Sequence, residues 1–158
     1  MSQMRYAVPE CIRSNCNQAR YSRWLHAKAV AHTRRDRKRF GEDSCTIAGY
    51  KAAIHAAVAA GGDKDYYTGE VLDWARVSTY ENAASKEGKV KYKKEFALLP
   101  TLDHTFDEHG QQKFVICSWR VNDMKGDMSD AEFYQLCALV LKYRSARNVK
   151  VVVRGVAE

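Results

Sequence analysis

The sequence contains no long apolar segment. None of its stretches approaches the roughly 20 apolar residues that a helix needs to cross a bilayer. The start, MSQMRYAVPECIRSN, also lacks the apolar middle region of a signal peptide. Five cysteines form an odd and widely spread set, which argues against a disulfide framework and for reduced thiols. We therefore expect a cytoplasmic protein with no membrane partner.

Two common metal motifs are missing as well. Cys117 has no cysteine partner two or three residues away, so a structural zinc knuckle is not expected. No helical metal motif such as His-Glu-x-x-His occurs, and His26, His32 and His55 are therefore interpreted as structural or surface residues on expected helices. The sequence shows no internal repeat and no low-complexity segment.

Basic residues exceed acidic ones. The 158 residues include 26 Lys plus Arg and 19 Asp plus Glu, which gives a formal charge of +7 and favours a polyanionic partner whose binding weakens with salt. The excess is clustered in two runs, and either run could contact phosphates or simply solvate helix ends and loops. The runs comprise Arg34, Arg35, Arg37, Lys38 and Arg39, with Asp36 among them, and Lys86, Lys89, Lys91, Lys93 and Lys94.

The length predicts one domain, residues 1–158, with an N-terminal helical part over 1–62 and a second part over 63–158. Apolar spacing predicts a helix over Asn17 to Arg39. A second helix, capped by Ser44 or Thr46, is expected to continue through Ala60 and to end at Gly61-Gly62. The two helices could bind DNA as a pair or pack over the rest of the chain, and their alanine content favours packing.

The second part is expected to contain a hairpin and a helix. Strand-forming residues occupy Phe96 to Leu102 and Lys113 to Trp119, with a polar segment between them. A helix begins after Ser129, because Glu132 three positions later completes a capping box and apolar residues follow at helical spacing. Tyr66 to Ser85 is interpreted as a link between the two parts, and Val149 to Val156 has strand character.

An Asp-His pair at the end of the first expected strand suggests a metal-assisted site. The Asp103 carboxylate can bind a divalent cation, and His104 can take a proton from water because its usual pKa lies near neutrality. Pairing of the strands would bring this loop close to the segment before Ser129. Asn122 or Asp123 could then supply a second metal ligand.

These residues resemble the HNH endonuclease family, whose core is a β-hairpin and a helix around one metal ion. The resemblance covers the last third to half of the chain, and YYTGEVLDW, Tyr66 to Trp74, looks like an element found ahead of that core. Asp103 and His104 match the family's metal ligand and general base. Asn122, followed by Lys125-Gly126-Asp127, matches the second ligand and its trailing segment.

The resemblance implies an α+β protein in which N-terminal helices pack with a C-terminal ββα-metal core. The implied function is hydrolysis of DNA phosphodiester bonds. His104 would be the base, and a metal ion would be held by Asp103 and Asn122. Magnesium is expected because the ligands are oxygens, although manganese, nickel or zinc could bind.

Several alternatives stay open. The family's middle Asn is missing, so Gln112 or a backbone carbonyl would have to orient the imidazole. Lys125 could be merely solvated, or it could stabilise charge that builds up beside a scissile phosphate. The main functional alternative is a noncatalytic nucleic-acid-binding protein with a degenerate core. A third is a regulator built on the N-terminal helices, with Asp103 and His104 in an ordinary turn. The sequence predicts no oligomeric state.

Overall fold

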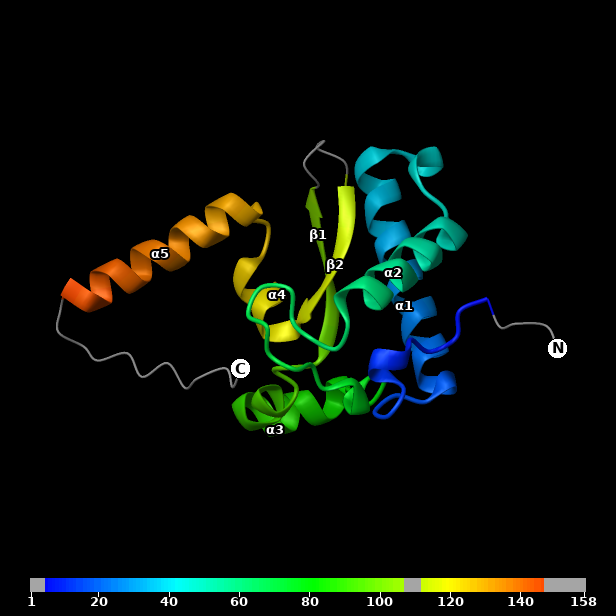
Figure 1. Ribbon diagram of the computed structural model, residues 1–158, viewed down its shortest axis with the longest axis horizontal. Helices are drawn as coiled ribbons and strands as arrows, with labels where there is room; N and C mark the ends of the chain where they lie inside the picture. Colours follow the sequence, from blue (N-terminus) through cyan, green and yellow to red (C-terminus); the bar gives the residue numbers. More distant parts are fainter. Residues whose placement is uncertain (1–4, 107–111, 147–158) are drawn as a thin grey trace.

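The computed structural model describes residues 5–106 and 112–146, and it has an α+β architecture. Two N-terminal helices are followed by a β-hairpin with further helices packed against it (Figure 1). The helices are α1 (Gln18–Phe40), α2 (Ile47–Gly61), α3 (Asn82–Glu95), α4 (Trp119–Lys125) and α5 (Asp130–Ala146), and the strands are β1 (Pro100–Phe106) and β2 (Gln112–Ser118). Short 3₁₀ turns cover Glu10–Ile12, Glu42–Ser44 and Trp74–Arg76. No described helix is both long and apolar enough to cross a membrane.

Helices α1 and α2 begin where the sequence predicts. The Asn17 side chain accepts a hydrogen bond from the amide of Arg20, and the Thr46 side chain accepts one from the amide of Gly49, so each satisfies a free amide of the first turn. The helices pack on each other and, through α2, on strand β2 (Figure 1). Packing over the hairpin, the reading that the alanine content favours, is therefore confirmed.

The core combines residues from both halves of the chain. Trp24 of α1 and Trp74, in the segment between α2 and α3, meet edge to face, with ring centroids 5.1 Å apart. Ile54 of α2 and Leu102 and Ile116 of the hairpin are buried in the same cluster. The hairpin therefore depends on the N-terminal helices for a partner, as expected for two strands that cannot be stable alone.

The segment between α2 and α3 is fixed to the hairpin by one buried carboxylate. Asp65 is 2% exposed, and its Oδ1 accepts hydrogen bonds from the amides of Tyr67 and Thr68 at 2.7 and 3.0 Å. Its Oδ2 accepts from the amide of Ser118 at 2.6 Å. Because Ser118 ends β2, this carboxylate positions Tyr67 beside the strands.

The first strand lies four residues further along the chain than predicted. β1 covers Pro100–Phe106, so Asp103 and His104 lie inside a strand and not in the loop that the sequence suggested. The two strands pair antiparallel, with Asp103 opposite Val115 and His104 opposite Phe114. Successive strand residues alternate between the two faces, so Asp103 and His104 leave β1 on opposite sides, although both reach the same cavity. Residues 107–111, which contain His109, lie outside the described residues.

The helices after the hairpin were predicted in part. α4 was not predicted; Ser118 caps it and Gly126, at φ 56°, ends it, a backbone conformation that favours glycine. The capping box of α5 is confirmed, because Glu132 Oε2 accepts from the amide of Ser129 at 2.8 Å and Ser129 Oγ accepts from the amide of Glu132 at 3.3 Å. Helix α3 was not predicted either, and the expected strand at Val149 to Val156 lies outside the described residues.

Candidate functional site

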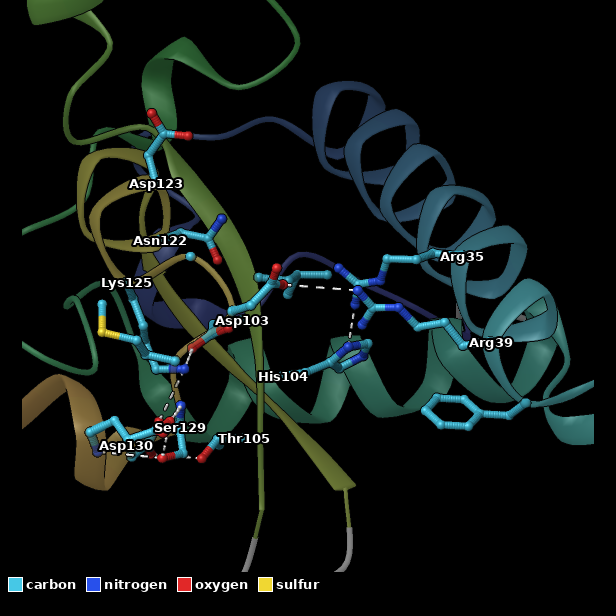
Figure 2. A pocket seen from close by; sticks show the side chains of 16 residues that line it. Arg35, Arg39, Asp103, His104, Thr105, Asn122, Asp123, Lys125, Ser129 and Asp130 are labelled. Atoms are coloured by element: carbon cyan, nitrogen blue, oxygen red, sulfur yellow. Dashed lines mark hydrogen bonds and ion pairs between the residues drawn. The ribbon is translucent and has the colours of Figure 1, made fainter.

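A cavity of about 500 Å³ separates the end of α1 from the turn between α4 and α5, with β1 along its floor (Figure 2). Each of the four residues expected at the catalytic and metal site lines this cavity: Asp103, His104, Asn122 and Lys125. Asp123 and Asp127 also line it. The structure therefore brings together two segments that are about 20 residues apart in the chain, as the sequence predicts.

On one face of β1, Asp103 belongs to a buried ionic network. Its Oδ2 accepts a hydrogen bond from the Tyr67 hydroxyl at 2.6 Å and lies 2.9 Å from Lys125 Nζ. Asp130, in the first turn of α5, lies 3.4 Å from the same ammonium through Oδ1 and accepts from Tyr67 at 2.9 Å and from Thr105 at 2.6 Å. Lys125 thus pairs with two carboxylates and is 3% exposed, so the alternative that it is merely solvated is wrong.

The charges of this network stabilise one another. Burial disfavours the charged form of Lys125, but hydrogen bonding to and attraction by Asp103 and Asp130 outweigh burial and raise the pKa of the ammonium. Burial likewise opposes ionisation of Asp130, but its hydrogen bonds from Thr105 and Tyr67 and the charge of Lys125 lower the carboxyl pKa. Burial and the neighbouring Asp103 raise the pKa of Tyr67 far above its usual range. At neutral pH Tyr67 is therefore a hydrogen-bond donor.

On the opposite face, His104 lies against α1. Its ring packs on Phe114 of β2, with centroids 4.4 Å apart, and meets His32 edge to face at 4.9 Å. Nε2 lies 3.5 Å from Oδ2 of Asp36 but, among the described residues, has no hydrogen-bond partner. Nδ1 is in close contact with the Arg35 guanidinium.

These contacts fix the tautomer of His104. A guanidinium can only donate hydrogen bonds, so Nδ1 accepts from Arg35 and the single proton of a neutral ring is on Nε2. Burial and then the charge of Arg35 lower the pKa of His104 to about 4, although Asp36 opposes the shift. The imidazole is therefore neutral at pH 7, with its lone pair on Nδ1.

The backbone of Gln112, the residue suggested from the sequence, pairs with Phe106, two positions from the residue opposite His104. The Asp36 carboxylate of α1 lies 3.5 Å from Nε2 of the imidazole, and Asp36 is itself held by Tyr50, whose hydroxyl donates to it at 2.8 Å. Sequence reasoning missed Asp36; its only signal is that it is the single acidic residue within a basic run.

The first basic run has several distinct environments. Arg35 and Arg39 line the cavity, and Arg39 lies 3.9 Å from the fully exposed carboxylate of Asp127 across it. Arg34 and Lys38 are exposed but are not among the lining residues. Arg37 donates two hydrogen bonds to the carbonyl of Cys45, so its guanidinium supports the connection to α2.

The second run lies along α3. Lys91, Lys93 and Lys94 are exposed. Lys93 and Lys94 line a groove of about 540 Å³ together with Trp119 and Arg120 of α4. Asp123 lines both this groove and the main cavity, so the two hollows are neighbours.

Tyr67 and Asp130 were also missed as site residues. Tyr67 lies in the YYTGEVLDW segment, which was noted only as an element ahead of the core. Asp130 follows the Ser129 cap, where an acidic residue is fully explained by the helix dipole. Neither residue has a sequence spacing that indicates its contact with Asp103.

Comparisons with protein-family models, with curated proteins and with solved structures return no match. Within the described part of the chain, no three His, Cys, Asp or Glu side chains are grouped closely enough to hold a metal ion.

Proposed function

We propose that this protein is a metal-dependent endonuclease that hydrolyses phosphodiester bonds in DNA, with an HNH-like ββα core formed by the hairpin and the helices that follow it. One observation carries the proposal: Asp103, His104 and Asn122 line one cavity, and Arg35 and Arg39 of α1 line the same cavity. A carboxylate, an amide oxygen and a neutral imidazole are the groups needed to hold a hard cation and to activate water. The arginines suit a phosphate.

The oxygen donors fit a magnesium ion. Both contacts of Asp103 with Tyr67 and Lys125 use Oδ2, which leaves Oδ1 to bind metal, and Asn122 would supply the second oxygen. Two protein ligands suit Mg²⁺, which usually keeps several waters, and manganese could replace it. They do not form a closed zinc site. When bound, the ion would neutralise the negative charge that develops on the phosphate.

His104 would act as the general base. Its lone pair is on Nδ1, and the low pKa keeps that atom unprotonated at neutral pH. Asp36 next to Nε2 would stabilise the imidazolium that forms when Nδ1 takes the proton of the attacking water.

Arg35 controls access to this lone pair. Its guanidinium covers Nδ1 in the free protein, and its side chain is 42% exposed. A phosphate entering the cavity would offer Arg35 a charged acceptor that is stronger than a neutral imidazole. Movement of Arg35 onto the phosphate would then free Nδ1 for water, so that substrate binding would switch on the base.

The second candidate is a noncatalytic nucleic-acid-binding protein. The observation in its favour is the 2.9 Å contact between Lys125 and Asp103, because the carboxylate already has a built-in cation. In this case the cavity and the Lys93–Lys94 groove would bind the phosphate backbone without cleaving it. The two candidates differ in one respect, which is turnover.

A plasmid-cleavage assay distinguishes the two candidate functions. We expect nicking with Mg²⁺ or Mn²⁺, and no nicking in excess chelator. Replacing His104 with Ala should lower the rate about 10²- to 10⁴-fold, the usual contribution of a general base, while DNA binding persists. His26→Ala is the matched control, because His26 is exposed on α1 outside the cavity, and it should cleave like the wild type. Binding without nicking under every metal condition would favour the second candidate, and full activity of His104→Ala would remove His104 as the base.

A further inference from the structure

The groove between α3 and α4 has an apolar lining. Val90 of α3 and Ala97 just after that helix contribute to it, together with Trp119 and Met124 of α4. Val90 is 65% exposed and Met124 is 61% exposed. Apolar side chains that gather in an open hollow mark a site for a ligand with apolar surface of its own.

Two lysines add positive charge to this lining. Lys93 and Lys94 are exposed in the groove, and within the described part of the chain neither forms an ion pair. Arg120 also lines the groove, but it is already paired with Glu70. Asp123 is the acidic member of the lining, so the two lysines leave an excess of positive charge. The groove therefore suits an anionic occupant.

The groove adjoins the main cavity across α4. Asn122 and Lys125 of this helix line the cavity, Trp119 lines the groove, and Asp123 lines both. Asn122 and Asp123 lie next to each other on the α4 side of the cavity (Figure 2). A polymer bound across the cavity can therefore continue into the groove without leaving the protein surface.

An uninterrupted DNA duplex cannot use both properties of the groove. Its outer surface presents phosphates and sugars, while the faces of its bases are stacked inside. An unpaired strand offers phosphates and free base faces together, and proteins that bind such strands combine positive charge with aromatic side chains. Trp119 supplies the aromatic ring here, because it is only half-buried although it packs on Tyr80, with ring centroids 5.8 Å apart.

We propose that this groove binds unpaired nucleotides beside the phosphate that the cavity holds. Lys93 and Lys94 contact the phosphates of the strand, and Trp119 packs against a base. The preferred substrate is therefore DNA with a single-stranded stretch next to the cleavage point, and not an uninterrupted duplex. This inference rests on the proposed function, because the same strand has to occupy the cavity.

Tryptophan fluorescence reports on the groove. The chain has three tryptophans, and Trp24 and Trp74 are only 5% and 1% exposed, so Trp119 is the one that a bound base can reach. In excess chelator, where binding is observed without turnover, a single-stranded oligothymidine should quench the emission, and a blunt duplex of the same length should not. Trp119→Phe keeps an aromatic ring against Tyr80 and should remove the quenching while DNA binding persists.

The affinity for tailed DNA gives a second measurement. A duplex that carries a single-stranded tail should bind the wild type about tenfold more tightly than the blunt duplex, the factor expected when one base packs on an aromatic ring. Fluorescence anisotropy of labelled DNA measures both affinities. Equal affinities would contradict the inference.

Lys94 and Lys91 form a matched pair for the charge. Both are exposed on α3, three residues apart, but Lys91 does not line the groove. Lys94→Gln should weaken binding of the single strand several-fold and should reduce the slope of log affinity against log salt by about 0.7, the value for one phosphate contact with a single strand. Lys91→Gln should leave both quantities as in the wild type. Circular dichroism checks that both variants keep their helix content.

The outcomes distinguish this inference from the nuclease proposal. Quenching without nicking would support the groove and reject the enzyme, whereas nicking of plasmid without quenching by the single strand would reject the groove alone. Equal salt dependence in Lys94→Gln and Lys91→Gln would also overturn it. So would displacement of the oligonucleotide by polyglutamate at equal charge, which would identify an acidic peptide as the occupant. Shielding of Trp119 from acrylamide in the free protein would overturn it too, since another part of this chain would then fill the groove.

Discussion

The two faces of β1 differ in how the polar residue at the centre of each is surrounded. Asp103 is enclosed by hydrogen bonds and by the ammonium of Lys125, so its charge is neutralised inside the protein. His104, one residue later, has one ring nitrogen without a hydrogen-bond partner among the described residues and the other covered by an exposed arginine. The first face is organised for stability, whereas the second buries a neutral imidazole with an unpaired ring nitrogen, at some cost to stability.

The largest loss of stability is expected when Lys125 is removed from the first face. Lys125→Met keeps much of the side-chain volume but leaves buried Asp103 and partly exposed Asp130 side by side without a cation. It should lower the free energy of unfolding by about 3–5 kcal/mol. Urea denaturation measures the loss. Lys94→Met, an exposed site, is the control and should change stability by less than about 0.5 kcal/mol.

The same variant also tests whether Asp103 binds a metal ion. If Asp103 binds magnesium, the vacated pocket should attract the ion more strongly, and Mg²⁺ should raise the melting temperature of Lys125→Met more than that of the wild type. Equal shifts in both proteins would contradict a metal site at Asp103. A small loss of stability in Lys125→Met would instead show that the ionic network is not the stabilising face of the strand.

Acidification should lower the free energy of unfolding mainly through the second face, which carries His104. His104 has a pKa of about 4 in the folded protein against a usual value near 6.5, so the unfolded chain takes up the proton first. The stability contributed by the neutral ring is complete above pH 6.5 and is lost as the pH falls toward 4, by on the order of 3 kcal/mol. Buried His32, whose pKa is lowered to about 3, adds to the loss in the same direction.

Urea denaturation at pH 7 and at pH 4.5 measures this loss. His104→Gln removes one of the two histidines and should make stability less sensitive to pH over this interval, with the remaining dependence due to His32. Equal pH dependence in the variant and the wild type would show that the imidazole of His104 is not held neutral by the fold.

The smallest loss of stability is expected when the Tyr67 hydroxyl is removed. Tyr67→Phe removes the single hydroxyl proton that Asp103 and Asp130 share, and because both carboxylates keep other partners it should cost about 1.5–3 kcal/mol. Tyr66→Phe is the adjacent control; Tyr66 is 48% exposed, and the change should be within about 0.5 kcal/mol of neutral. Equal effects of the two substitutions would show that the hydroxyl does not bridge Asp103 and Asp130.

Local sequence signals were sufficient for much of the fold. Asn17, Thr46 and Ser129 each cap a helix because capping depends on residues within one turn. The start of β1 was missed because Phe96 to Leu99 is as apolar as a strand, although backbone bonding folds it into turns after α3. Helix α3 was missed because its lysine-rich face shows no strong apolar period.

The site was predictable in its residues but not in their contacts. The Asp-His pair and Asn122 could be found because they lie in short motifs. Lys125 as an internal counterion and Asp36 as the partner of the imidazole could not, because each contact joins segments that the tertiary fold alone brings together. Spacing along the chain gives no information about such long-range pairs.

The buried carboxylate of Asp65 has a consequence for motion. It joins the amides of Tyr67 and Ser118, which are 51 residues apart, and the next residue after Ser118 begins α4. Opening of this segment would break the Tyr67 contact with Asp103 and loosen the start of the helix that carries Asn122 and Lys125. The cavity wall should therefore open and close as one cooperative unit, with shared hydrogen-exchange rates, and not residue by residue.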